Sequence, residues 1–287
     1  MQRSLFLAKF LRKTKIIQNG LLRFVSFALR KKLSNSVFKI PVIRNMGWNN
    51  IFDNEPWMNQ VLEKIVSQRG GIFLDIGANI GQTLLKIKSI SSSVEYYGFE
   101  VNPACLFYLS ELIKLNEFQS SFIIPSGLSD KPGLTSLHYF SGNSDDATAS
   151  IIEQVRPDAK VFKKEYVSLT RLDDLDKIFQ NNIGIIKIDV EGAELEVVNG
   201  STATINKHRP VILIEILPAY SSANTGRINR QIELEQLLVS LDYKIFQIEK
   251  DTKNNFKSIK YLKNIGINTN IIDRDYILFP AENILKL

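Results

Sequence analysis

The chain has one cysteine, two histidines and no long uncharged apolar run among its 287 residues. A single cysteine, Cys105, excludes a disulfide framework within the chain, and we expect it in the core of a helix. His138 and His208 stand alone, without the cysteine and histidine spacing of a zinc site. No uncharged run approaches the ~20 apolar residues that cross a bilayer. These absences predict a globular protein of a reducing compartment, which we expect to be the cytoplasm.

Acidic residues are missing from the first 52 positions, which hold eleven of the 36 lysines and arginines. The remainder of the chain, residues 53–287, then has 25 basic and 30 acidic residues, a charge of about −5. We therefore expect a basic amphipathic arm at residues 1–49 and a mildly acidic body at residues 50–287.

The arm mixes apolar and aromatic residues with basic ones, and over residues 1–35 this pattern predicts two amphipathic helices broken near Gly20. Lys9, Arg12 and Lys13 interrupt the apolar segment that a signal peptide needs. Such helices can lie on an anionic membrane surface, here the inner membrane face. Alternatively the arm packs on the body or on a twin subunit in a homo-oligomer. No nucleic acid is expected as a partner, because the body is acidic.

The most informative stretch is residues 70–81, in which an apolar run ends in Asp75 and a turn containing Gly77, Asn79 and Gly81 follows. A helical pattern begins just after the turn, so this is the strand–turn–helix corner of an open α/β fold. A dinucleotide fold needs G-x-G-x-x-G, whereas these two glycines are four residues apart. An acid before the turn repels a pyrophosphate but suits an ammonium or sulfonium group. The expected cofactor is therefore S-adenosylmethionine rather than NAD.

Two further acids follow predicted strands. Residues 94–99 predict a second strand, and Glu100 comes directly after it, 25 residues beyond Asp75. An acid at this place hydrogen-bonds ribose hydroxyls in nucleoside-binding α/β folds. Asp130 follows a third predicted strand at residues 121–128, where it either accepts from an adenine amino group or is a turn residue.

The second informative stretch is residues 183–200. An apolar strand carries Lys187 and Asp189 near its end, and Glu191 then opens a helix that ends at Gly200. A strand lysine beside an aspartate should be paired, because burying either charge alone is costly. The next strand, residues 211–216, places Glu215 at the same ligand-binding edge of the sheet.

The rest of the chain gives weaker predictions. Residues 36–57 look irregular, and Pro56 begins a helix that covers the sheet. Two additional strands, residues 135–140 and 162–170, enclose a polar loop that is either a substrate flap or a passive insertion. Residues 243–248 and 276–279 predict the last two strands, with a loop across residues 251–270.

These motifs resemble those of the FkbM-type methyltransferases, which are S-adenosylmethionine-dependent O-methyltransferases. The resemblance covers roughly residues 50–280 and rests on four segments: residues 73–81 (FLDIGANIG), 98–103 (GFEVNP), 127–130 (GLSD) and 186–194 (IKIDVEGAE). It implies the Rossmann-like class I fold, a seven-stranded, mostly parallel sheet with an antiparallel last strand and helices on both faces. It also implies that six residues line the cofactor: Asp75, Gly77, Asn79, Gly81, Glu100 and Asp130. Asp189 and Glu191 would lie near the point of methyl transfer.

Methyl transfer to an alcohol requires a positioned oxygen and a base for its proton. We expect Asp189 or Glu191 to be that base, with Lys187 orienting the pair and Glu215 as a reserve candidate. In a variant of this mechanism, Asp189, Glu191 and Glu215 hold Mg²⁺, which would acidify the acceptor hydroxyl. The metal-free version is favoured.

The resemblance implies a sugar, a glycan or a lipid-linked saccharide as acceptor, with a polyketide or another small alcohol as the alternative. An NAD oxidoreductase is disfavoured by the missing middle glycine. An RNA ribose methyltransferase is disfavoured by the acidic body and the lack of an RNA-binding module. A non-catalytic, membrane-associated interaction protein would need only the arm.

Overall fold

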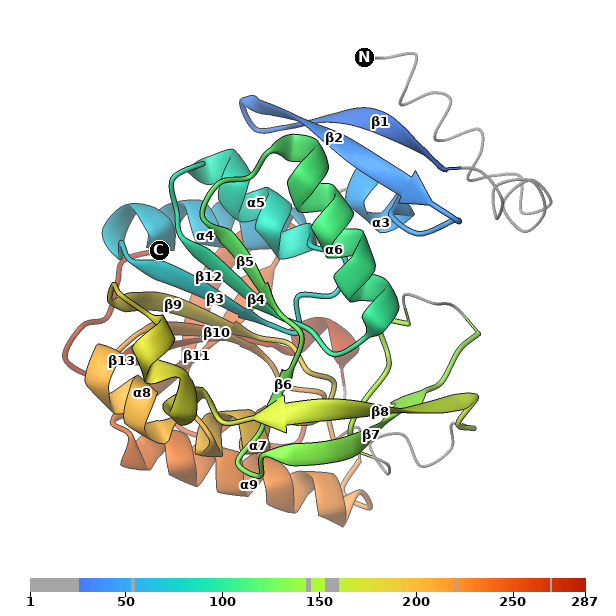
Figure 1. Ribbon diagram of the computed structural model, residues 1–287. Helices are drawn as coiled ribbons and strands as arrows, with labels where there is room; N and C mark the ends of the chain where they lie inside the picture. The colour runs from blue at the N-terminus through green and yellow to red at the C-terminus, as the bar shows by residue number, and fades with distance from the viewer. Residues whose placement is uncertain (1–25, 53–54, 143–145, 153–159, 220, 269) are drawn as a thin grey trace.

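A computed structural model of the chain describes residues 26–52, 55–142, 146–152, 160–219, 221–268 and 270–287. The first 25 residues of the predicted helical arm lie outside these ranges. The fold is an eight-stranded mixed sheet with helices on both faces and two smaller sheets attached to it (Figure 1).

The central sheet has the strand order β12-β11-β13-β10-β9-β3-β4-β5. Its parallel part comprises β5 (Ser121–Ile124), β4 (Tyr96–Phe99), β3 (Ile72–Ile76), β9 (Ile183–Ile188) and β10 (Val211–Glu215). The last strand, β13 (Asp275–Pro280), runs antiparallel between β10 and β11 (Tyr243–Lys250). This order, with its inserted antiparallel strand, confirms the predicted Rossmann-like fold.

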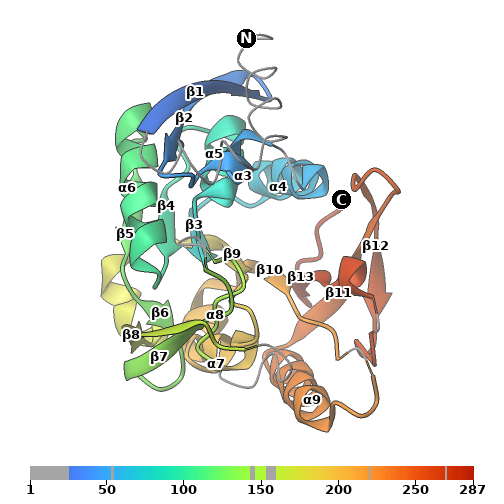
Figure 2. The same cartoon turned by 90° about the vertical axis from the view of Figure 1, so that its right-hand side faces the viewer.

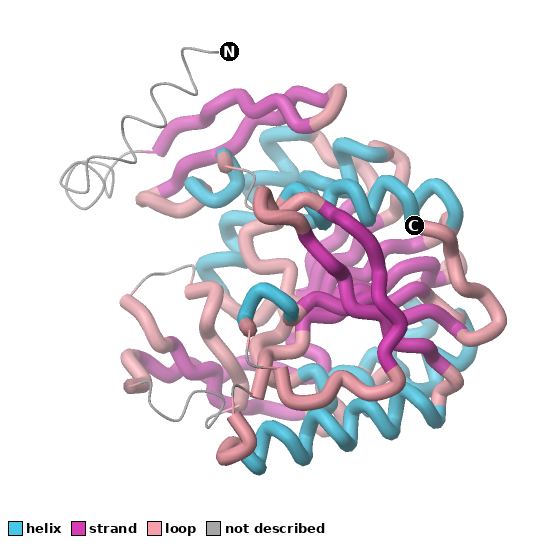
Figure 3. Tube along the Cα trace, turned by 180° about the vertical axis from the view of Figure 1, so that it is seen from behind, coloured by secondary structure: helices cyan, strands magenta, loops and turns pink. Residues whose placement is uncertain are grey.

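An eighth strand, β12 (Phe256–Leu262), extends the sheet beyond β11, where we predicted a loop (Figure 3). The turn between β11 and β12 is tied to the first turn of α4 (Pro56–Gln68), because the Trp57 N–H donates to the Asn254 carbonyl at 3.1 Å. The Phe256 N–H likewise donates to Gln60 Oε1 at 2.7 Å. The loop prediction was wrong because β12 is an edge strand with lysines on its exposed positions.

The two faces of the sheet bury two separate apolar clusters. α4, α5 (Gln82–Ile90) and α6 (Pro103–Asn116) cover one face, where Phe73 of β3 and Ile185 of β9 point. α7 (Glu194–Asn199), α8 (Thr202–His208) and α9 (Thr225–Ser240) cover the other, with the 3₁₀ helix η2 (Leu172–Ile178). The side chains of β3 and β9 therefore point alternately into the two apolar clusters. Those of Asp75 and Lys187 point to the face that α4, α5 and α6 cover.

Residues 26–52 differ most from the sequence prediction. β1 (Ser26–Leu33) and β2 (Ser36–Ile43) form an antiparallel hairpin, and the short helix α3 (Trp48–Ile51) follows. Phe38, Ile40 and Val42 of β2 belong to the same apolar cluster as α4 and α6. The helix expected to reach residue 35, the irregular segment expected after it and the boundary expected at residue 49 are therefore corrected: the body begins no later than β1.

A small three-stranded sheet has the order β6-β8-β7, formed by β6 (Gly127–Leu128), β7 (Gly133–Tyr139) and β8 (Lys163–Thr170). The third strand predicted at residues 121–128 is thus divided between this sheet and β5 of the central one. The small sheet and the β1–β2 hairpin lie on opposite sides of the molecule (Figure 2). The segment between β7 and β8 includes the polar loop of the sequence prediction.

Candidate functional site

A cavity of about 720 Å³ opens at the carboxyl ends of the parallel strands. Its walls come from the turns after β3, β4 and β9, from the small sheet and from the turn between β11 and β12. This volume suits a ligand of nucleotide size, and this edge of the sheet is where open α/β folds bind ligands.

The turn after β3 is shaped by two backbone contacts. Gly77 has a φ of +84°, and a Cβ at this residue would lie 1.9 Å from the backbone oxygen of Asp189. The N–H groups of Gly77 and Ala78 both donate to the Phe99 carbonyl at 3.0 Å. The turn after β3 is thus packed directly between those after β4 and β9, which leaves room only for glycine at this position.

Glu100 is the best-anchored acid of the cavity wall. One carboxylate oxygen accepts from the backbone N–H of Asn79 at 2.6 Å, and the other accepts from the N–H groups of Val101 and Asn102 at 2.8 and 2.7 Å. Burial raises the pKa of Glu100, and the three N–H donors oppose this effect. A carboxylate oxygen accepts two hydrogen bonds, so Glu100 Oε2 keeps one lone pair for a ligand hydroxyl.

Asp75 lies behind the cavity wall rather than on it. Its side chain has no exposed surface, and Asp75 Oδ2 accepts from the Tyr96 hydroxyl at 2.6 Å. Asp75 Oδ1 lies 3.4 Å from Lys187 Nζ, its cross-strand neighbour on β9. The direct contact with a cofactor that the sequence suggested is therefore corrected: β3 points this side chain at Lys187, between the sheet and its helices.

Lys187 joins this buried acid to the cavity. Its ammonium lies 3.4 Å from Asp75 and 3.1 Å from Asp189 Oδ2, and Asp189 itself lines the cavity. Burial alone would lower the pKa of Lys187, but the carboxylates of Asp189 and Asp75 outweigh burial and raise it. The predicted pairing of the strand lysine is confirmed, with two carboxylates instead of one.

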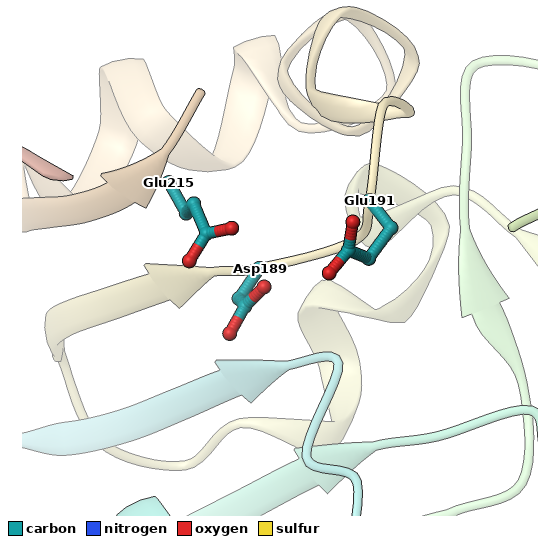
Figure 4. Close-up of side chains that lie close together, drawn as sticks. All are labelled: Asp189, Glu191 and Glu215. Carbon is teal, nitrogen blue, oxygen red and sulfur yellow. The ribbon is translucent and has the colours of Figure 1, made fainter. Parts of the chain in front are cut away.

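Three carboxylates meet at one end of the cavity, as Figure 4 shows. Oxygen atoms of Asp189, Glu191 and Glu215 all lie within 4.8 Å of one another. Arg274 also pairs with Glu215 at 2.9 Å. Burial, followed by the charge of Asp189, raises the pKa of Glu215 to about 10 despite Arg274. Glu215 therefore carries a proton at neutral pH, while Lys187 balances the charge of Asp189.

Of the remaining predicted cofactor residues, Asn79 lines the cavity, Gly81 supports its wall and Asp130 lies outside its lining. Asn79 lines the cavity and accepts from the Cys105 thiol at 3.3 Å, while Cys105, which we expected only in a helix core, also lines the cavity. Gly81 is the N-cap of α5 and has a φ of +79°, and a Cβ there would lie 2.8 Å from the side chain of Leu109. Asp130 lies outside the lining set and accepts from the Ser129 hydroxyl at 3.3 Å.

Five of the six residues at 146–151, a segment that begins within the predicted polar loop, line the cavity. Asp146 accepts from the backbone N–H groups of Phe140, Ser141 and Thr148 at 2.8 to 3.0 Å. The Ser150 hydroxyl donates to the Glu191 carbonyl at 2.8 Å. The loop is therefore bonded to the turn that carries Glu191, and its role as a substrate flap or a passive insertion stays a prediction.

The sequence prediction missed one wall of the cavity. Five of its residues are Glu55, Trp57, Lys250, Arg274 and Asp275, which come from the start of α4 and from the last strands. Lys250 pairs with Asp275, donates to the Ile272 carbonyl at 2.9 Å and lies 4.7 Å from the Trp57 ring centroid. No motif marks these positions, since each contributes a single side chain from a separate part of the chain.

Among the described residues, no helix is both long and apolar enough to cross a membrane.

Comparison with known proteins identifies the group to which these motifs belong. The family described as "Methyltransferase FkbM domain" matches residues 75–245 of this chain. A curated relative, "Methyltransferase sdnD" of Sordaria araneosa, is 32% identical over 152 residues, which cover 44% of this chain and 59% of the relative. The chain thus spans less than two thirds of that relative's length.

Solved structures give weaker likenesses. The methyltransferase FkbM of Methylobacillus flagellatus has 16% identity and a TM-score of 0.45, covering 73% of this chain and 43% of that one. A caffeoyl-CoA O-methyltransferase candidate of Staphylococcus aureus has 14% identity and a TM-score of 0.43, covering 78% and 82%. Because both scores are below 0.5, the fold assignment rests on the strand order.

Proposed function

Because the chain belongs to the family of FkbM methyltransferase domains, we propose that it transfers the methyl group of S-adenosylmethionine to a hydroxyl oxygen. We propose oxygen as the atom that accepts the methyl group because Asp189, Glu191 and Glu215 meet in the cavity that Glu100 also lines. A hydroxyl must lose its proton during the transfer, and carboxylates beside the bound acceptor can take it.

The residues of the cavity suit this cofactor in two ways. Glu100 keeps an acceptor lone pair for a ribose hydroxyl, while Gly77 allows the turns after β3 and β9 to meet at the cavity wall. When bound, the cofactor would supply an electrophilic methyl group on a sulfonium centre. Gly77, Asn79 and Glu100 would hold its nucleoside part, with Asp75 and Gly81 supporting the wall, and a contact of Asp130 with the adenine amino group stays a prediction.

The assignment of the base follows from the charges of the three acids. Glu215 is protonated at neutral pH because its pKa is raised to about 10, so it is a poor acceptor of a further proton. Asp189 and Glu191 remain as candidate bases. Lys187 Nζ, 3.1 Å from Asp189 Oδ2, fixes the orientation of that carboxylate. Lys187 is thus a positioning residue, and its ammonium is itself paired with the buried Asp75 at 3.4 Å.

Magnesium remains the variant mechanism. Three carboxylates offer the oxygen ligands that a hard cation prefers. However, Lys187 already balances the charge of Asp189 at 3.1 Å, and Glu215, which carries a proton and lies 2.9 Å from Arg274, is a poor ligand for a cation. The metal-free mechanism is therefore preferred. A titration of the protein with Mg²⁺ that produces tight binding, lost in Glu191→Gln, would reverse this preference.

The charges of the cavity wall narrow the class of acceptor. Its lining includes eight acids and three bases; the acids are Glu55, Glu100, Asp146, Asp189, Glu191, Glu215, Asp251 and Asp275. The bases Lys187, Lys250 and Arg274 each lie beside one of these acids, and even with Glu215 protonated the other seven acids outnumber the three bases. A phosphate or carboxylate next to the accepting hydroxyl would meet this negative field, so the acceptor is uncharged there. A neutral sugar hydroxyl suits this wall, also when the sugar is part of a glycan or a lipid-linked saccharide.

The decisive experiment begins with calorimetric titration of the protein with S-adenosylhomocysteine. Micromolar binding is expected, and Asp189→Asn should keep it. Transfer of labelled methyl groups to a panel of neutral, phosphorylated and carboxylated sugars and small alcohols then tests the acceptor, with Asp189→Asn lowering the rate by about 10²–10⁴-fold. A folded protein that does not bind the product cofactor would favour a non-catalytic interaction protein. Near-normal turnover by Asp189→Asn would exclude Asp189 as the base.

A further inference from the structure

The outer face of the β1–β2 hairpin gathers basic side chains. Arg30 lies directly opposite Lys39 in the strand register, and Lys32 lies opposite Val37. Directly opposite residues of an antiparallel pair share a face, and so do residues two apart on one strand. All four side chains are exposed, with Val37 at 55%. The hairpin therefore presents three positive charges around one exposed apolar side chain.

These charges are not compensated by the rest of the described chain. Like charges directly opposite each other destabilise a strand pair. Within the ranges that the structure describes, neither Arg30, Lys32 nor Lys39 forms an ion pair. Residues 1–52 contain no acid that could pair with them. The fold thus keeps a repulsive arrangement on a face that the described residues leave open.

The hairpin is held firmly against the methyltransferase body. The Asn116 amide donates to the Lys39 carbonyl at 2.7 Å, and Asn116 Oδ1 accepts from the Lys39 N–H at 2.8 Å. The Tyr108 hydroxyl donates to the Pro41 carbonyl at 2.8 Å, and Asn50 links Tyr108 to the Ile80 carbonyl in the turn after β3. The positive face is therefore a fixed outer layer of the molecule (Figure 1).

We propose that this face docks the protein onto an anionic lipid surface. A membrane presents many negative headgroups in one plane, which suits three positive charges that share one face of the hairpin. Val37 favours lipid over nucleic acid, because an exposed apolar side chain can enter the interfacial region. Six more basic residues and no acids precede the hairpin in residues 1–25. The proposal is independent of the methyl-transfer chemistry.

Sedimentation of the full chain with lipid vesicles tests the proposal. Vesicles of phosphatidylcholine with phosphatidylglycerol are compared with vesicles of phosphatidylcholine alone, at low and at physiological salt. Each charge near such a surface strengthens binding roughly fivefold, so Arg30→Gln/Lys32→Gln/Lys39→Gln should weaken it by about a hundredfold. The matched control removes three exposed lysines on and next to β12, in Lys257→Gln/Lys260→Gln/Lys263→Gln, and should bind like the wild type.

The outcomes distinguish binding through this face from binding through the positive charge of the protein as a whole. Equal weakening in both triple variants, or no binding of the wild type to anionic vesicles, would overturn the proposal. So would tighter binding to duplex RNA that anionic vesicles cannot displace. The Arg30→Gln/Lys32→Gln/Lys39→Gln chain should melt at or above the wild-type temperature, because like charges are removed. If it does not fold, Arg30→Gln and Lys39→Gln singly should each weaken binding roughly fivefold. Titration with S-adenosylhomocysteine should be unchanged in all of them.

Discussion

Gly77 and Asp189 touch through their backbones, and this contact joins the two most informative segments of the chain. A Cβ on Gly77 would lie 1.9 Å from the Asp189 carbonyl oxygen, while the Asp189 N–H donates to the Ile76 carbonyl at 2.9 Å. The turn that would face the proposed cofactor and the residue that we propose as a base are therefore positioned by each other.

Gly77→Ala tests this contact. The added Cβ would force the turns apart at a residue whose φ is +84°, so we expect a loss of about 2–4 kcal/mol in the free energy of unfolding. Binding of S-adenosylhomocysteine should fall as well. Gly70→Ala is the control, since no atom lies within 4 Å of a Cβ there, and it should change stability by less than about 0.5 kcal/mol. If urea denaturation gave the same loss of unfolding free energy for Gly77→Ala and Gly70→Ala, the prediction would be contradicted.

Glu100→Gln should weaken binding of S-adenosylhomocysteine about 10–100-fold. The amide replaces one carboxylate oxygen with a donor, which then faces a backbone N–H instead of accepting from it. Calorimetric titration measures the change. Glu117→Gln, at an exposed helix end, should bind normally. Unchanged affinity in Glu100→Gln would remove Glu100 from the ribose site.

Lys187→Met should destabilise the fold by about 3–5 kcal/mol, because it leaves the buried Asp75 without its cationic neighbour. The double variant Asp75→Asn/Lys187→Met should recover part of the loss. Urea denaturation provides the measurement, with Lys257→Met as the exposed control. If the single and double variants are equally unstable, the loss comes from packing and not from charge.

Glu215 predicts a pH dependence of stability. Its folded pKa is raised to about 10 from the ordinary glutamate value of about 4.5, so above pH 4.5 the folded state keeps a proton that the unfolded state releases. This group therefore contributes less stability as the pH rises from about 4.5 to about 10. Glu215→Gln keeps a neutral side chain, and its stability relative to the wild type should increase steadily between pH 5 and pH 9. A difference that does not vary with pH would show that Glu215 is ionised in the folded protein.

The sequence identified the elements in which several signals coincide. At residues 72–90 an apolar run, a glycine turn and a helical pattern follow each other, and β3 and α5 lie there. At residues 183–200 a charged pair marks the end of β9, and Gly200 follows α7 as expected. The three acids Asp189, Glu191 and Glu215 could be expected together because parallel strands end at one edge of the sheet.

The β1–β2 hairpin was not predicted although its period-two pattern was present. Phe27, Leu29 and Leu33 recur with a period of two, but Lys31 interrupts this apolar face, and the run of charge at residues 30–32 suggested a helix. Tertiary packing decides the outcome, since Phe38 of β2 meets Phe118 with ring centroids 5.5 Å apart. Asp75 was misplaced for a related reason: the motif indicates the turn, but only the strand register shows that its side chain points at Lys187.

The turn between β11 and β12 belongs to a wall of the cavity that can change in sequence without altering the wall that faces the proposed cofactor. Residues 77–105 of the cavity wall face the proposed cofactor, while Glu55, Trp57 and residues 250–254 form a wall from other parts of the chain. Hydrogen bonds through Asn254 and Gln60 hold this second wall against α4, away from the turn after β3. Relatives can therefore diverge in the length and charge of this turn, and acquire other acceptors, while the apparatus for the methyl donor stays intact.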